Sequence, residues 1–237
     1  MSGKVEFSVP HSRISSWSCM AVVVVVCLGL VADVLLTLYA GETTTRILAR
    51  ISLATDNSIP TFIASLLLLS CAALLALTAK AEQQKRTKKV WPWWFLSAVF
   101  VFLAMDEVAM LHELSGQVLE RLVPAIRSLG PIFHYAWTAI AVPLLIGLAV
   151  LLAPWLFELP PRTRLLFLCS AALFVSGAVG VEVVNSAIDA QTTGRSLAYS
   201  LMTVFEETLE FAGVLSFQFA LLKNLGESRF DLNIVLR

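Results

Sequence analysis

The chain has 237 residues, of which 58% are hydrophobic and only 14% are charged, with 17 basic and 17 acidic side chains. Soluble domains are about 45–50% apolar and about 25% charged, so this composition excludes a water-soluble globular domain and predicts a polytopic membrane protein. The net charge is zero and no basic face is interleaved with aromatic side chains, so we expect no nucleic-acid partner.

Six apolar stretches are long enough to cross the hydrocarbon core of a bilayer, about 30 Å thick, as helices. In chain order they cover residues 17–39, 59–79, 91–114, 134–156, 164–186 and 197–222. No internal repeat and no long linker divides them. The predicted fold class is therefore all-α, with one domain of six transmembrane helices over residues 1–237.

Basic residues are concentrated on one side of the predicted bundle. The loop between the second and third spans carries Lys80, Lys85, Arg86, Lys88 and Lys89, whereas the loops on the opposite side carry fewer basic residues. Short loops rich in Lys and Arg remain in the cytoplasm. We therefore expect a multi-pass protein of the cell membrane, in contact with membrane lipid, with both termini in the cytoplasm.

The connection over residues 115–133 has an amphipathic pattern, because Val118, Leu119 and Leu122 recur at helical spacing between polar residues. Such a segment is typical of a helix that lies in the membrane interface. An extension of the third span that packs on its neighbours would show the same pattern, and the sequence leaves both interpretations open.

Many of the acidic residues lie inside or at the ends of the predicted spans, where charged groups are rare. They are Asp33, Asp106, Glu107, Glu113, Glu182, Asp189, Glu206, Glu207 and Glu210. No Lys or Arg lies in those interiors, and a buried carboxylate without a counter-charge is costly. These carboxylates must be protonated, hydrated or gathered around a cation.

The acids of separate spans are expected at a common depth. At 1.5 Å per residue, Asp106 lies past the middle of the third helix, and Glu182 and Glu206 lie in the outer parts of the fifth and sixth. Asp106 and Glu113, seven residues apart, would share one helix face. Because the first, third, fifth and sixth helices carry the acids, we expect them to form an inner bundle, with the second and fourth outside.

A stripe of small residues indicates how the fifth helix packs. Ala172, Ser176 and Gly180 are four residues apart in this helix. Small residues at this spacing let two helices approach closely in a membrane. We therefore expect this stripe to face the neighbouring helices.

Two acidic motifs stand out, D-E-x4-H-E at residues 106–113 and E-E-x2-E at residues 206–210. The pair resembles a pattern of uncharacterised six-helix bacterial membrane proteins, which implies a bacterial inner membrane as the setting and no known activity. Carboxylates and a histidine in a four-helix core are also similar in architecture to ferritin-like di-metal proteins. Those proteins use Glu-x-x-His, whereas here Ala109 lies three residues before His112.

The acids and the imidazole together predict a site for a divalent metal ion in the outer half of the bundle. The predicted ligands are Asp106, His112, Glu113, Glu182, Glu206 and Glu210, and Glu107 and Glu207 are candidates for a general base or for further ligands. Iron, manganese and zinc suit such a donor set, and magnesium and calcium are compatible with it. We expect a structural hydrogen bond for Asp33, simple solvation for Asp189 and an interfacial position for His134.

Three functions fit these residues. The first is a metal-dependent enzyme, a hydrolase or an oxidoreductase, that acts on a lipid or a membrane-soluble small molecule. The second is a transporter or channel for protons or divalent cations, and the third is an accessory protein that holds a metal. The sequence favours the enzyme, because acids are almost absent from the inner halves of the spans.

Overall fold

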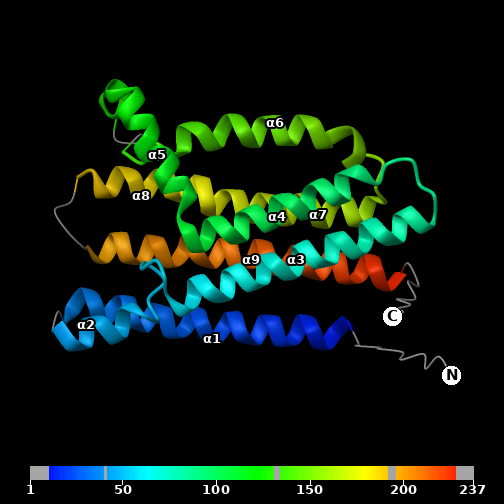
Figure 1. Cartoon of the computed structure of the whole chain (residues 1–237). Coiled ribbons are helices and arrows are strands. Elements are labelled where there is room, and N and C mark those ends of the chain that lie inside the picture. The colour runs from blue at the N-terminus through cyan, green and yellow to red at the C-terminus, as the bar shows by residue number, and fades with distance from the viewer. Residues whose placement is uncertain (1–10, 40–41, 131–133, 192–195, 228–237) are drawn as a thin grey trace, which may run out of the picture.

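The computed structural model describes residues 11–39, 42–130, 134–191 and 196–227. Within these ranges the chain is helical and contains no strand, which confirms the all-α fold class (Figure 1). The α-helices are α1 (His11–Leu38), α2 (Glu42–Ala49), α3 (Ile59–Gln84), α4 (Trp91–Ala109), α5 (Leu111–Leu122), α6 (Thr138–Leu156), α7 (Pro161–Val175), α8 (Glu182–Asp189) and α9 (Leu197–Glu227). A 3₁₀ helix follows α5 at Pro124–Leu129, and a π-helical segment, Ser176–Val181, joins α7 to α8.

Five helical segments are long and apolar enough to cross a membrane, as expected of a multi-pass protein. They are α1, α3, α4, α6 and the continuous segment Pro161–Asp189 that contains α7 and α8. The sixth predicted span corresponds to α9, which has 31 residues and runs alongside the others (Figure 1). Its crossing of the membrane stays a prediction.

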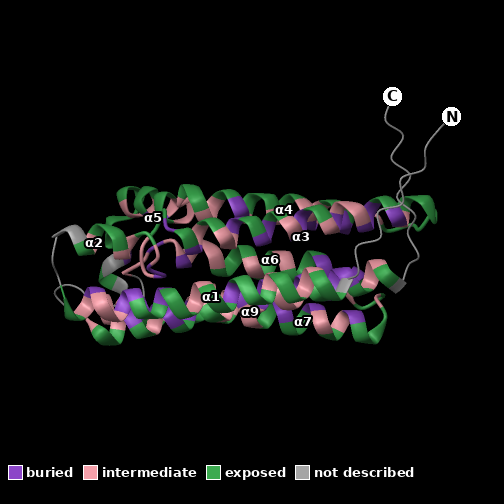
Figure 2. Ribbon diagram, turned by 90° about the horizontal axis from the view of Figure 1, so that it is seen from below, coloured by how far each residue is buried: buried purple, intermediate pink, exposed green. Residues whose placement is uncertain are grey.

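α9 lies at the centre of the bundle, where it packs against α1, α3, α7 and the π segment. α3 packs most extensively on α4 and is the most buried of the five apolar segments. α6 lies on the outside and is largely exposed (Figures 1 and 2). The prediction that α3 lies outside is therefore wrong. Every face of a membrane helix can be apolar, so a lack of acids does not show whether a helix is central or outside. Small buried residues such as Cys71, Ala72 and Ala79 let α3 pack closely on its neighbours.

Aromatic side chains fill the half of the bundle nearest the basic loop between α3 and α4. We call Trp93, Phe100, Trp155, Phe167 and Phe217 the aromatic layer. Trp93 meets Trp155 edge-on with ring centroids 4.9 Å apart, and Phe217 stacks on Phe100 at 4.9 Å and tilts against Phe167 at 4.7 Å. Offset and edge-on contacts of this kind are the favourable geometries for aromatic pairs. They join α4, α6, α7 and α9 into one packed layer.

Two glycines let α9 approach the segment from α7 to α8. A Cβ atom added at Gly213 would lie 2.6 Å from the backbone nitrogen of Phe174, and one added at Gly177 would lie 2.9 Å from the backbone oxygen of Glu206. Both contacts are shorter than real Cβ atoms allow. The backbones of the two helices therefore touch where α9 passes the π segment.

The stripe of Ala172, Ser176 and Gly180 does not form this contact. All three residues are exposed, and a Cβ at Gly180 would meet nothing closer than Ser176 at 4.0 Å. The prediction from small-residue spacing is wrong because the stripe lies beside Gly177 on the helix, rotated away from α9. Spacing alone does not show which of two adjacent small residues faces the neighbour.

Candidate functional site

The predicted third span is divided in two. α4 ends at Ala109, Met110 adopts a left-handed conformation with φ 50° and ψ 43°, and α5 begins at Leu111. α5 leaves α4 at an angle (Figure 1). Asp106 and Glu113 therefore do not share one helix face, and this prediction is wrong. The break lacks the Gly or Pro that normally marks one, so the sequence gives no signal for it.

α5 is a separate amphipathic helix and not a straight extension of α4. Its apolar residues Leu114, Val118 and Leu122 are exposed, and its Gly116 is buried against Trp137. This confirms the helical pattern of the connection. Its position in the membrane interface stays a prediction.

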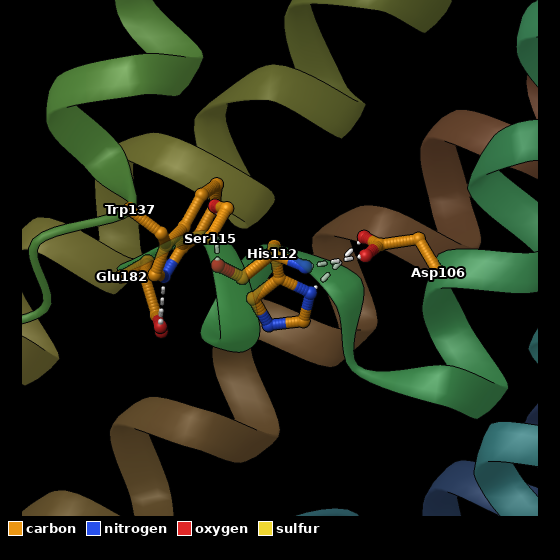
Figure 3. Close-up of polar contacts among 5 residues, drawn as sticks. All are labelled: Asp106, His112, Ser115, Trp137 and Glu182. Carbon is orange, nitrogen blue, oxygen red and sulfur yellow. Dashed lines mark hydrogen bonds and ion pairs between the residues drawn. The ribbon is translucent and has the colours of Figure 1, made fainter. Parts of the chain in front are cut away.

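Asp106 bridges the break between α4 and α5. Its Oδ1 accepts a hydrogen bond of 2.7 Å from the backbone nitrogen of His112, and its Oδ2 lies 3.0 Å from His112 Nδ1 (Figure 3). The carboxylate thus satisfies a first-turn N–H group of α5 and fixes the imidazole ring, as a capping side chain does. The ring meets Trp137 edge-on with centroids 4.9 Å apart.

The charge on His112 depends on this contact. Burial lowers the pKa of His112, but the hydrogen bond and the negative charge of Asp106, with smaller contributions from Glu113 and Glu182, outweigh it and raise the pKa above 6.5. The pKa of Glu113 is also raised, first by burial and then by Asp56. Glu113 itself is exposed, so the structure places this predicted ligand away from the buried acids.

A second polar group joins α8 to α9. Glu206 is only 7% exposed, and its Oε2 accepts a hydrogen bond of 2.6 Å from Asn185 Nδ2. Glu182 lies within hydrogen-bonding reach of Glu206 and accepts a bond of 3.3 Å from Trp137 Nε1 (Figure 3). The structure therefore brings the predicted ligands Glu182 and Glu206 together. It adds Asn185, three residues after Glu182 in α8, which was not among the predicted site residues.

The remaining glutamates surround a cavity between α3, α4, α7 and α9. Glu107, Glu207 and Glu210 line it together with apolar residues, and its volume is about 10 Å³. That is close to the smallest space that holds one water molecule. We call this the three-glutamate cavity. It unites the two candidate bases with the predicted ligand Glu210.

The π segment was missed by sequence reasoning. It lies directly before Glu182 and packs against α9 at Gly177, where Glu206 and Glu210 are the nearest residues. Single π turns inside α-helices occur frequently at functional sites. The small-residue run SGAVGV at 176–181 is the signal that could have indicated it.

Asp33 has the structural role that was predicted for it. Its side chain is 1% exposed, accepts a hydrogen bond of 2.5 Å from Ser52 Oγ, and also accepts bonds from the backbone nitrogens of Leu53 at 3.0 Å and Ala54 at 3.4 Å. It holds the segment between α2 and α3 against α1. This acid is therefore satisfied by protein donors.

The structure corrects the prediction for Asp189. Its Oδ2 lies 3.3 Å from His134 Nε2 and accepts a hydrogen bond of 3.2 Å from the Tyr135 hydroxyl, so the carboxylate is paired and not simply solvated. Helical periodicity shows which residues of one helix share a face, but it does not predict contacts with a distant loop. The contact of Asp189 with His134 and Tyr135 was missed for this reason. His134 is only partly exposed at this end of the bundle.

The predicted metal ligands fall into separate groups. In the part of the chain that the structure describes, no three His, Cys, Asp or Glu side chains are arranged to hold a metal ion. Asp106 pairs with His112, Glu182 with Glu206, and Glu210 faces the three-glutamate cavity. This arrangement does not support the predicted set of six ligands.

None of these carboxylates is paired with a Lys or Arg side chain across the described ranges. Within these ranges Lys85 pairs with Glu82 and Lys89 pairs with Glu158, and both ion pairs lie at the basic end of the bundle. The acid cluster, which we define as Asp106, Glu107, Glu182, Glu206, Glu207 and Glu210, thus carries an excess of acidic groups. His112 is its one imidazole partner within those ranges.

A family profile described as Domain of unknown function (DUF8692) matches residues 18–225. The chain belongs to this family. The match includes both acidic motifs and begins in α1 and ends in α9, so it covers the bundle and the acid cluster alike. No curated protein and no solved structure matches the chain. The predicted membership of an uncharacterised family is confirmed, whereas a bacterial origin, six spans and the two acidic motifs as features of that family stay predictions.

Proposed function

We propose that the chain is a six-span membrane protein that takes cations from the outer side into its acid cluster and transports them. In this proposal α9 is the sixth span. The basic end, with the loop between α3 and α4, faces the cytoplasm, because Lys and Arg favour that side. The acid cluster then lies in the outer half of the membrane, where the sequence also places it.

The excess of acid over base is the observation that carries this proposal. Glu206 is nearly buried, yet its neighbours in the cluster are other carboxyl groups and the Asn185 amide. A buried ionised carboxylate without a partner is too costly to persist. Positive charge from outside the chain, as protons or metal cations, must therefore balance the cluster.

The arrangement of the acids favours transport over a single fixed ion. Glu113 lies exposed at the α5 end, Glu182 and Glu206 follow towards the interior, and the three-glutamate cavity lies beyond them along α9. Ionisable residues inside a membrane commonly mark ion pathways. The aromatic layer lies next along the bundle and would form the closed inner gate.

Cation uptake into liposomes tests the transport proposal. Purified protein is reconstituted, and the uptake of Mn²⁺ and of protons is followed with fluorescent indicators in the lumen. We expect uptake by the wild type and the loss of most of it in Glu207→Gln and Glu210→Gln. Glu158→Gln, at the basic end, is the matched control and should behave as the wild type. Absence of uptake in the wild type, or normal uptake in the two variants, would contradict transport.

A metal-dependent enzyme is the second candidate, and the Asp106–His112 pair favours it. Metal-binding histidines usually have one ring nitrogen held by a carboxylate, which leaves the other for the metal. His112 Nδ1 is held by Asp106, and Nε2 has no hydrogen-bond partner within the described ranges. The enzyme would act on a lipid or a membrane-soluble molecule, with Glu107 or Glu207 as general base.

Elemental analysis tests this second candidate. The wild type would carry a transition metal, iron, manganese or zinc, after purification without added metal. Glu206→Gln and Asp106→Asn should reduce its content. A wild type without metal, or variants with undiminished metal, would remove the enzyme from consideration.

A further inference from the structure

Asn185 carries a buried oxygen that lacks a donor. The residue is 1% exposed, and its Nδ2 donates to Glu206 Oε2 at 2.6 Å and to Thr203 Oγ1 at 3.4 Å. Its Oδ1 has no hydrogen-bond partner. Buried polar atoms in proteins are nearly always paired, so such an atom indicates a missing water or ion.

Rotation of the amide does not remove the problem. With Glu206 ionised, as a bound cation requires, exchanging the two atoms would place Oδ1 against the carboxylate, where two acceptors would face each other, and would leave Nδ2 without an acceptor instead. The orientation with Nδ2 on Glu206 is therefore the better one. In this orientation Oδ1 belongs to the same amide that contacts the acid cluster.

The contacts of this amide are made by its Nδ2 atom, so the acids that would share a cation with Oδ1 lie beside the same side chain. Glu206 and Thr203 contact Nδ2, and Glu182, one helical turn before Asn185 in α8, lies within hydrogen-bonding reach of Glu206. Hard divalent cations such as Mg²⁺, Ca²⁺ and Mn²⁺ prefer carboxylate and amide oxygens. Two carboxylates also balance the double positive charge of one such ion, and this neutrality lowers the cost of holding the ion in a buried site.

We propose that Asn185 Oδ1, Glu182 and Glu206 bind one hard divalent cation, with water completing its coordination. Two of the ligands come from α8 and one from α9, where the close contact at Gly177 holds the helices together. The amide oxygen adds a ligand that the predicted set of acids and histidine did not include. This inference deepens the proposed function, because it names a divalent cation as the transported ion and rests on the same acid cluster.

The chain supplies a matched control. Gln218, also in α9, is 2% exposed, donates from Nε2 to Ser70 Oγ at 2.7 Å, and has an unpartnered Oε1. The hydrogen-bond partner of Gln218 is a hydroxyl group and not a carboxylate. Asn185 and Gln218 thus share an unpaired buried oxygen but differ in the acids beside it.

Mn²⁺ binding to the full-length protein in detergent micelles tests the site, with electron paramagnetic resonance to count bound ions. We expect one bound Mn²⁺ in the wild type and displacement by Mg²⁺ or Ca²⁺. Asn185→Leu and Glu206→Gln should weaken binding by about tenfold or more. Gln218→Leu should bind as the wild type does.

Asn185→Asp separates ligation from folding. This variant keeps an oxygen at the site, so it should bind Mn²⁺ at least as tightly as the wild type, whereas Asn185→Leu should not. A wild type without bound Mn²⁺, full binding in Asn185→Leu, or equal loss in Gln218→Leu would overturn the assignment. If Mn²⁺ binds but is not taken up into liposomes, the transport proposal is refuted and the proposed cation site stands. If Mn²⁺ is taken up but does not bind at Asn185, the proposed site is refuted and the transport proposal stands.

Discussion

The two halves of the bundle differ in the neighbours that they give to their buried side chains. In the aromatic layer, ring packs on ring, and the nearby Gln218 amide donates to a hydroxyl group of α3. In the acid cluster, carboxyl groups lie beside carboxyl groups, and Asn185 keeps an unpaired oxygen. The first half also leaves one amide oxygen unpaired, Gln218 Oε1, but that amide lies beside a hydroxyl group and not beside carboxyl groups. In the second half the carboxyl groups have no Lys or Arg partner within the described ranges, and in the proposed function cations from outside balance them.

A lysine placed in each half should give the largest contrast. Phe217→Lys would bury an ammonium group among aromatic rings and should lower the free energy of unfolding by about 3–5 kcal/mol. Glu207→Lys should change it by less than about 1 kcal/mol, because Glu107 and Glu210 would pair with the new charge. Detergent-denaturant titration of the two variants measures both values. Equal losses would remove the distinction between the halves.

The carboxylate of Asp33 accepts its hydrogen bonds from protein donors. Its loss should therefore lower stability but leave cation uptake unchanged. Asp33→Ala removes the acceptor for Ser52 and Leu53 and should lower the free energy of unfolding by about 1.5–3 kcal/mol. Asp189→Ala, at a side chain that is 39% exposed, should cost less than about 1 kcal/mol. Liposome uptake normalised to folded protein should be unchanged in Asp33→Ala; a specific loss would place Asp33 in the cation pathway.

The contact between α9 and α7 supports both halves. Gly213→Ala would push a methyl group against the backbone of Phe174 and should lower the free energy of unfolding by about 1–3 kcal/mol. A Cβ at Gly147 in α6 would meet nothing within 4 Å, so Gly147→Ala should be neutral or stabilising by up to about 1 kcal/mol. Thermal unfolding of the two variants gives the comparison. Similar behaviour would show that the helices are not packed at Gly213.

The Asp106–His112 pair should give the smallest effect, visible as a pH dependence. The pKa of folded His112 is raised above 6.5, so its contribution to stability is fully present below the unfolded pKa of about 6.5 and is lost as pH rises through the folded value. Asp106→Asn should reduce this dependence. The fluorescence of Trp137, beside the ring, reports the titration when wild type and Trp137→Phe are compared. A titration midpoint at or below 6.5 in the wild type would be inconsistent with the pair.

The positions of the helices could be predicted from the sequence, whereas their packing could not. Apolar length gives a span directly, and α3 and α6 begin and end near the expected residues. The break at Met110 depends on the Asp106 carboxylate reaching the backbone of α5, a contact between residues that no local pattern indicates. The central position of α3 was missed because lipid-facing and protein-facing residues are equally apolar.

The candidate site was predictable in part for a similar reason. The depth of Glu182 and Glu206 follows from counting residues, and the structure brings these two together. Asp106 and His112 form a group separate from Glu182 and Glu206 because the helix breaks at Met110, and the sequence did not predict this break. Asn185 was not among the predicted ligands because that prediction considered acids and histidine, and its burial and its unpaired oxygen are visible only in the structure.

Cross-linking across the three-glutamate cavity is the most direct measurement of the central idea, that carboxyl groups from different helices share one pocket. Glu107→Cys and Glu207→Cys are combined in a chain without its four native cysteines, and a short thiol-bridging reagent is added in membranes. We predict rapid cross-linking for this pair and none for Val108→Cys with Glu207→Cys, since Val108 is exposed and does not line the cavity. No bridge between positions 107 and 207, or equal bridging in the control, would contradict the shared pocket.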